Sequence, residues 1–177
     1  MNRISFSPFP NLTTERFVLR QLTPEDDEKI FLLRSDKEIN KYLDRPIAKI
    51  IEDARQFISK INTSFAKNES IYWAVSLKDN PKLIGTVCLW NISADGSNAE
   101  IGFELLPEFH GRGIMQEVLP AVIKFGFETM KINSISGEVD PLNMKSIKLM
   151  QRFGFIYQKR LENTEIYALQ NRNSKKY

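Results

Sequence analysis

Residues 105–116, LLPEFHGRGIMQ, carry the strongest fold signal in this chain and its first candidate binding site. An apolar strand end is followed by Pro107, a Gly111-Arg112-Gly113 turn and the start of a helix. Glycines let a backbone approach a ligand closely, and the first N–H groups of a helix have no acceptor within it. With the helix dipole, such a turn forms a site for a phosphate-type anion, to which Arg112 adds charge-assisted contacts. A tight strand-to-helix turn without any ligand explains the same two glycines.

The same residues exclude two common nucleotide-binding loops. A P-loop needs G-x-x-x-x-G-K-[ST], which the sequence does not contain. A dinucleotide fingerprint needs a third glycine three residues after the second, where this chain has Gln116. The loop therefore predicts an anion site of another kind.

Upstream of this loop, the hydrophobic pattern predicts two helices and a meander of strands. Residues 15–22 alternate as in a strand, and a helix with Thr23 as its cap and Pro24 at its first position follows. A second helix is expected over residues 51–66, where apolar side chains form one stripe. Strand-like runs cover residues 71–77, 83–90 and 99–106, with a turn at 78–81 between the first two.

Downstream of the loop, helices and strands alternate. A helix is expected from the loop to about Met130, and Pro120 inside it should remove one hydrogen bond and kink it. Further segments are expected at residues 133–139 (strand), 144–152 (helix), 155–157 and 165–169 (strands). This alternation after a meander predicts a mixed α/β sheet with helices on its faces.

Composition narrows the function. The 177 residues fit one domain, expected at 1–170, before a polar and basic tail at 171–177. With Cys88 as the single cysteine and His110 as the single histidine, no disulfide framework and no cysteine- or histidine-rich metal site is expected. A net charge of +3 gives no support to a nucleic-acid partner, and no apolar run predicts a membrane segment or a secretion signal. We expect a cytoplasmic protein.

Four motifs occur in the order in which a known family has them. They are T-E-R-F-V-L-R at 14–20, L-I-G at 83–85 with A-E-I-G-F at 99–103, H-G-R-G-I-M at 110–115, and N-x-x-S at 143–146 with F-G-F at 153–155. Together they resemble the GNAT family of N-acetyltransferases, most closely the branch that acetylates the N-termini of ribosomal proteins. The resemblance covers nearly the whole chain.

The resemblance implies acetyl-CoA as co-substrate and a mostly antiparallel sheet in which two strands splay to form a V-shaped slot. The strand ending at Leu105, which carries a bulge in the family, and the strand at 133–139 would form this slot. The implied cofactor contacts are Leu105, Leu106, His110, Gly111, Arg112, Gly113, Ile114, Met115, Gln116 and Asn143. Met115 stands where the family has Gly or Ala, so its side chain must point away from the pyrophosphate. For His110, packing within the loop is the alternative to a phosphate contact.

The implied chemistry needs a base, an oxyanion donor and a group that receives the thiolate. Glu100 matches the glutamate base of the family's histone-acetylating branch, and Glu104 is the second choice because it lies on the same strand face. Both carboxylates have an alternative role in binding a partner's basic group or Arg side chains. The Leu105 N–H is the expected oxyanion donor. Ser146 is the expected proton donor to the thiolate, because Met150 replaces the family's tyrosine; its alternative role is that of a helix-surface residue.

Three functions remain open from the sequence. The leading one is acetylation of a peptide or protein N-terminal amine, and the second is acetylation of a small amine such as a polyamine, amino acid or antibiotic. The third is an acyl-CoA sensor without catalysis. An acceptor wall is expected around residues 42–46 and 162–166, Cys88 is expected to be buried and inert, and the protein is expected as a monomer or homodimer.

Overall fold

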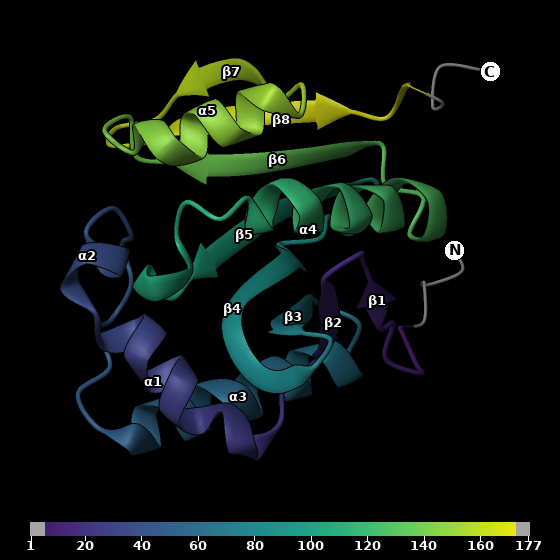
Figure 1. Cartoon of the computed structure of the whole chain (residues 1–177). Helices are drawn as coiled ribbons and strands as arrows, with labels where there is room; N and C mark the ends of the chain where they lie inside the picture. Colours follow the sequence, from purple (N-terminus) through teal and green to yellow (C-terminus); the bar gives the residue numbers. More distant parts are fainter. Residues whose placement is uncertain (1–5, 173–177) are drawn as a thin grey trace.

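An eight-stranded sheet organises the protein (Figure 1). The computed structural model describes residues 6–172. In sheet order the strands are β1 (Leu12–Thr13), β2 (Phe17–Gln21), β3 (Ile71–Leu77), β4 (Asn80–Trp90), β5 (Asn98–Leu105), β6 (Ser134–Val139), β8 (Glu165–Gln170) and β7 (Ile156–Arg160). All neighbours pair antiparallel except β5 and β6, which are parallel. The predicted mixed, mostly antiparallel α/β fold is confirmed.

Helices cover both faces of the sheet and enclose two apolar cores. They are α1 (Asp27–Ser35), α2 (Lys37–Asn40), α3 (Ile51–Ala66), α4 (Ile114–Lys124) and α5 (Met144–Arg152). On one face, α1 and α3 pack around Leu22 and Ala74. On the other, α4 and α5 bury the larger cluster around Trp73 and Ile101. None of the helices between residues 6 and 172 is both long and apolar enough to cross a membrane.

Helices and strands whose sequence shows a clear hydrophobic period have the predicted bounds. The observed structure differs from the prediction mainly at the ends of the other elements. The helices at 51–66 and 144–152 and the strand at 71–77 match α3, α5 and β3. The first helix begins as a 3₁₀ turn, Pro24–Asp26, before α1. Helix α4 continues through Pro120 and passes into a π-helical turn, Phe125–Thr129. The short elements β1 and α2 were not predicted, because two to four residues show no period.

The hairpin between β3 and β4 differs from the predicted turn. The turn was expected over residues 78–81, but β4 already begins at Asn80 and includes Pro81. The register with β3 shifts between Val75 and Leu77. Such an irregularity accommodates a proline, which has no N–H for the ladder.

The junction of β5 with β6 is short, and the two strands separate beyond it. Only Asn98–Glu100 of β5 pair with Ser134–Ser136 of β6, whereas β5 continues to Leu105 and β6 to Val139. The two strands therefore diverge as the resemblance implied. The expected bulge in β5 is not found: its pairing with β4 runs from Trp90–Glu100 to Gly85–Leu105 without a register shift.

The end of the described chain is attached to the sheet. The main-chain N–H of Asn171 donates to the Asn133 carbonyl at 2.8 Å, and its side-chain amide donates to the Ile132 carbonyl at 3.2 Å. Of the expected tail at 171–177, the first residue is thus hydrogen bonded. Residues 173–177 lie outside the described residues.

Gly85 in β4 allows β5 to approach closely, and its replacement should destabilise the fold. A Cβ atom there would lie 2.4 Å from the Glu104 carbonyl oxygen and 2.5 Å from Leu105 Cδ2. Because a backbone oxygen cannot move away alone, we predict that Gly85→Ala lowers the free energy of unfolding by about 2 kcal/mol. Chemical denaturation measures this, with the exposed Lys82→Ala in the same strand as control. Equal stability of the two variants would contradict the close approach.

Candidate active site

The loop before α4 presents unpaired main-chain N–H groups. Gly111 and Gly113 have left-handed φ angles of +74° and +69°. The first helical hydrogen bond is donated by Glu117 N–H to the Gly113 carbonyl, at 3.3 Å. The N–H groups of residues 114–116 therefore have no acceptor within the helix. A Cβ atom on Gly111 would meet nothing within 4 Å, so the loop has open space beside it.

The side chains of this loop mostly turn away from the open space. Ile114 and Met115 are buried in the larger core, which confirms that the Met115 side chain points away from the loop. The His110 ring Nε2 lies 2.9 Å from the Leu105 carbonyl oxygen, a contact within the loop of the kind that the packing alternative describes. The Arg112 guanidinium lies over the Phe109 ring, 5.5 Å from its centroid.

A clamp formed by Thr14, Arg16 and Glu117 holds the loop from behind. The Thr14 hydroxyl and the Arg16 main-chain N–H donate to Glu117 Oε1 at 2.6 and 2.7 Å, and Arg16 Nε donates to Oε2 at 2.6 Å. The Arg16 guanidinium also reaches the carbonyls of Arg112 (3.3 Å) and Gly113 (3.5 Å). The carbonyls of Arg112 and Gly113 are thus engaged by Arg16, while the N–H groups of residues 114–116 have no partner within the helix.

The clamp also sets the charge of Glu117. Partial burial acts to raise the pKa of this carboxyl group, but the hydrogen bonds from Thr14 and Arg16 outweigh it and lower the pKa to about 2. In the sequence, Thr14 and Arg16 stand out only as part of a family motif, and Glu117 does not stand out at all. No local pattern links residues about a hundred positions apart in the chain.

The diverging edge of β5 offers further main-chain groups. The Leu106 N–H donates to the Ile84 carbonyl at 2.9 Å. In an antiparallel pair the hydrogen-bonded residues alternate along a strand, so the even-numbered residues of β5 bond to β4 and the odd-numbered ones point to the other edge. The main-chain groups of Phe103 and Leu105 therefore point toward the slot. Leu106 was expected to contact the cofactor, but both of its main-chain groups already have partners. Its N–H donates to the Ile84 carbonyl, and its carbonyl accepts from the Phe109 N–H. Phe103 was missed by the sequence analysis.

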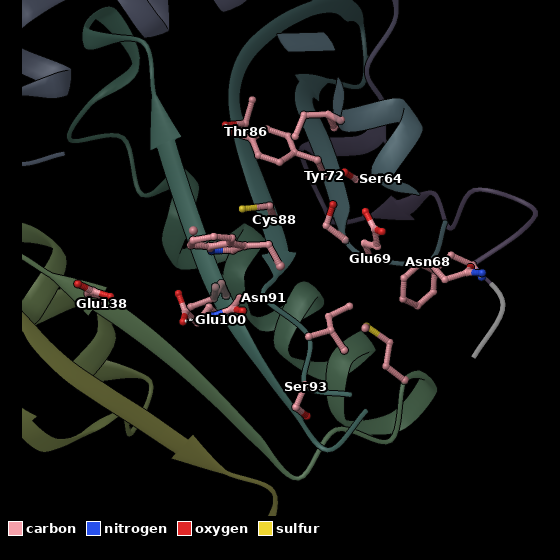
Figure 2. Close-up of a pocket in the computed structure, with 18 of the residues that line it drawn as sticks. Ser64, Asn68, Glu69, Tyr72, Thr86, Cys88, Asn91, Ser93, Glu100 and Glu138 are labelled. Atoms are coloured by element: carbon pink, nitrogen blue, oxygen red, sulfur yellow. Dashed lines mark hydrogen bonds between the residues drawn. The ribbon is translucent and has the colours of Figure 1, made fainter. Parts of the chain in front are cut away.

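The face of β5 that carries Glu100 and Glu104 borders a cavity of about 1200 Å³. Its walls come from α1, α3, β3, β4 and β5, and Glu138 of β6 also lines it. Figure 2 shows Glu100 beside Asn91, whose amide donates to Glu100 Oε1 at 2.7 Å. Asn91 has a φ of +47°, a conformation that asparagine tolerates better than most residues.

Glu104 is held by an arginine from the loop after α2. Arg45 Nη2 lies 2.6 Å from Glu104 Oε2, and the Thr86 hydroxyl lies 3.4 Å from Oε1. Only 9% of the Glu104 side chain is exposed. Arginine binding was the alternative role for these carboxylates, and Glu104 has that role.

Residues 43–45 of the expected acceptor wall line the cavity, whereas the hairpin at 162–166 does not.

The N-terminus of α5 carries the two remaining predicted residues. The Asn143 Oδ1 atom caps the helix by accepting from the Ser146 N–H at 3.2 Å, which leaves the Asn143 amide nitrogen available as a donor. Ser146 lies in the first turn and is partly exposed. Met150 is buried, with its sulfur where a Cβ on Gly137 would lie.

Cys88 and Tyr72 also border the cavity (Figure 2). Burial, reinforced by the charge of Glu104, raises the pKa of the Cys88 thiol to about 12. The expected burial of Cys88 is confirmed, and at neutral pH the thiol stays protonated and a poor nucleophile. Burial also raises the pKa of the Tyr72 hydroxyl, with the charge of Glu104 adding to the effect. Both groups are therefore uncharged.

Comparison with known proteins identifies the family. A family model described as an acetyltransferase (GNAT) domain matches residues 16–156. The uncharacterized N-acetyltransferase YoaA of Bacillus subtilis (strain 168) is 32% identical over 147 residues, 83% of this chain and 83% of that protein. The chain is a GNAT-family N-acetyltransferase. Among the residues that the structure describes, no group of three or more His, Cys, Asp or Glu side chains is placed to hold a metal ion.

Solved structures of the family share this fold. RimL, a ribosomal L7/L12 alpha-N-protein acetyltransferase in complex with coenzyme A, has a TM-score of 0.79 at 16% identity, over 91% of this chain and 98% of that chain. Spermidine N-acetyltransferase from Vibrio cholerae, in complex with CoA and spermine, has a TM-score of 0.77 at 20% identity, over 87% and 95% of the two chains. Identities this low establish the fold and leave the acceptor open.

The Glu117 clamp should make stability depend on pH. Because the pKa of Glu117 falls from 4.5 to about 2 on folding, its ionised form stabilises the folded state above about pH 4.5. We predict that Glu117→Gln lowers the free energy of unfolding by about 0.5–1 kcal/mol at pH 7. The effect is this small because solvent screens the half-exposed Arg16. The difference from the parent protein should shrink as the pH falls from 4.5 toward 2. Denaturation across this range measures it, with the exposed Glu108→Gln as control. A difference that does not shrink between pH 4.5 and pH 2 would argue against the clamp.

Proposed function

We propose that this N-acetyltransferase moves an acetyl group from acetyl-CoA to a primary amine, that of a peptide or protein N-terminus, by direct attack in a ternary complex. One observation carries the proposal. A single strand, β5, presents the main-chain groups of Phe103 and Leu105 to the slot between β5 and β6, and it presents Glu100 to the large cavity. A thioester in the slot and an amine in the cavity would thus meet along one strand.

The residues present fit acetyl-CoA. The unpaired N–H groups at 114–116, the open space beside Gly111 and the positive end of the α4 dipole suit a pyrophosphate. The main-chain groups of Phe103 and the N–H of Leu105 suit the pantetheine arm and its thioester end, while the Leu105 carbonyl is engaged by His110. The Asn143 amide nitrogen is the proposed donor from α5. When bound, acetyl-CoA supplies the activated acetyl group.

Glu100 is the proposed base. The amine reaches the enzyme protonated and must lose a proton before it attacks. Glu100 is the better candidate of the two acids, because Glu104 is neutralised by Arg45 while Glu100 is held by the uncharged amide of Asn91. The Asn91 contact to Oε1 leaves Oε2 to accept the proton, directly or through a water molecule.

Two other groups complete the proposed mechanism. The Leu105 N–H points into the slot, where it can donate to the oxygen on which negative charge develops. Ser146, in the first turn of α5, is the proposed proton donor to the departing thiolate. A thiol has a pKa near ~8.5, so the thiolate also leaves without a strong acid, and Ser146 is assigned a supporting role.

The cavity favours a peptide as the acceptor. Its volume of about 1200 Å³ exceeds the range of roughly 300–1000 Å³ that is usual for small-ligand pockets. A chain of several residues fits such a space better than a single small amine. A polyamine is the second candidate, because the acidic side chains of Glu100, Glu138 and Glu69 line the cavity and would attract a cation.

The pyrophosphate assignment is tested at a left-handed glycine. We predict that Gly113→Ala weakens coenzyme A binding about tenfold, because alanine is strained at a φ of +69° and the loop N–H groups would turn away. Isothermal titration calorimetry with coenzyme A gives the affinity. Gly96→Ala is the matched control, since Gly96 has a φ of +71° in a turn far from this loop. A well-folded parent protein that does not bind coenzyme A would refute the assignment.

The base is tested by a substitution that keeps the hydrogen bond to Asn91. We predict that Glu100→Gln lowers turnover by about 100-fold or more, while coenzyme A affinity stays within about twofold. Thiol release under saturating acetyl-CoA measures turnover, and Glu108→Gln is the control. Unchanged activity of Glu100→Gln at all pH values would move the base to another residue.

The acceptor is tested by comparing amines of different size. Thiol release with N-terminal peptides, polyamines and free amino acids separates the two enzymatic candidates. Release with peptides alone supports the proposal, and release with polyamines alone supports the second candidate. Coenzyme A binding without thiol release from any amine would instead indicate an acyl-CoA sensor.

A further inference from the structure

Arg34 is a cation on the cavity wall, and no acidic side chain in the described part of the chain pairs with it. It lies near the C-terminus of α1 and is partly buried. Its guanidinium carbon stands 4.0 Å from the centroid of the Phe57 ring. Within residues 6–172, no hydrogen bond or ion pair engages the Arg34 guanidinium. Its N–H edges therefore remain available toward the cavity, which Arg34 lines.

The carboxylate of Glu104, at the same end of the cavity, is already paired with Arg45. Glu104 is bound by Arg45 through both of its oxygens, at 2.6 and 3.4 Å. Asp44 also lines the cavity but makes no ion pair with either arginine in the described part of the chain. Burial, together with the charge of Arg45, lowers the pKa of Arg34. Arg45 thus occupies the Glu104 carboxylate, and the Arg34 guanidinium forms no ion pair of its own among residues 6–172.

We propose that Arg34 binds a carboxylate group of the acceptor and thereby selects acceptors that carry both an amine and an acid. The proposal rests on the proposed function, because it takes the amine to lie at Glu100. Glu100 and Glu104 are four residues apart on β5, or about 13 Å. Since Arg34 lies at the Glu104 end, amine and carboxylate would be separated by roughly 10 Å, the span of two or three residues of an extended peptide.

The surroundings of Arg34 suit a carboxylate. The Arg34 guanidinium lies over the Phe57 ring, and its planar fork of N–H donors suits two parallel hydrogen bonds to a carboxylate. The Tyr72 ring packs edge-on against Phe57, with the ring centroids 5.4 Å apart. Because burial keeps the Tyr72 hydroxyl protonated, it is a second donor at the same end. An acid side chain within a peptide and the terminal carboxylate of a short peptide share this chemistry.

The experiment pairs acidic acceptors with neutral ones of the same shape. Alanine tetrapeptide amides carry aspartate or asparagine at the second, third or fourth position, and dialanine is compared with dialanine amide. KM and kcat are measured by thiol release for the parent protein, Arg34→Met and Arg34→Lys. Lys29→Met, which removes a charge from the same helix outside the cavity, is the control.

We expect the parent protein to prefer at least one aspartate peptide, or free dialanine, over its neutral partner. Arg34→Met should raise KM for that acceptor about tenfold to a hundredfold and leave its kcat and the neutral acceptors within about twofold. Arg34→Lys should retain part of the preference, because it keeps the charge but not the fork. Equal use of acidic and neutral acceptors, or equal loss for both in Arg34→Met, would overturn the proposal.

Failure of the proposed function is seen separately. If no amine releases thiol, calorimetric titration of the same peptides into coenzyme A-saturated protein tests the carboxylate site directly. Tighter binding of the acidic peptides that disappears in Arg34→Met supports the site even without catalysis. Absence of such a preference refutes it, whatever the result with coenzyme A.

Discussion

The early separation of β5 from β6 is the constraint on which the rest of the site depends. Parallel pairing ends after three residue pairs, at Glu100 and Ser136. In the described residues, the remaining part of β5 pairs with no strand other than β4, although His110 contacts the Leu105 carbonyl. Buried main-chain groups need partners, so the free edge at Phe103 and Leu105 calls for another chain or a ligand with amide groups. The helix that follows begins beside this edge with three more unpaired N–H groups. A single topological feature thus brings together the main-chain donors of β5 and α4 that are proposed for the cofactor.

Two arginine–carboxylate pairs determine which charges remain available. Arg16 and Glu117 tie the N-terminal segment to the first turn of α4, where an acid would otherwise repel a phosphate. Arg45 binds Glu104, which leaves Glu100 as the acid without a cationic partner on that face of β5. Each pair has one partner from a segment distant in the chain. The tertiary fold therefore determines which acids, Glu104 and Glu117, are held in ion pairs and which acid, Glu100, is the candidate base.

The predictions succeeded where the signal was local. The apolar stripe of residues 51–66 and the strand run at 71–77 gave α3 and β3 with their observed bounds, because side-chain period directly reports which face is buried. They were less accurate at residues 78–81, where a register shift placed Pro81 inside β4. His110 illustrates the same limit: its type suggested a ligand contact or packing, and only the folded chain shows that its ring lies beside the Leu105 carbonyl.

By itself the sequence determined the fold class, the glycine loop before a helix and the presence of two acids on one strand face, since all of these depend on residues close together in the chain. Tertiary structure alone decided that Glu104 is paired with Arg45 and that Glu117 is clamped by Thr14 and Arg16. It also decided that, among residues 6–172, neither Glu100 nor Arg34 forms an ion pair. The physical reason is the range of the interactions. Hydrophobic period and helix capping are local, whereas an ion pair depends on which distant segment the folded chain brings within hydrogen-bonding distance.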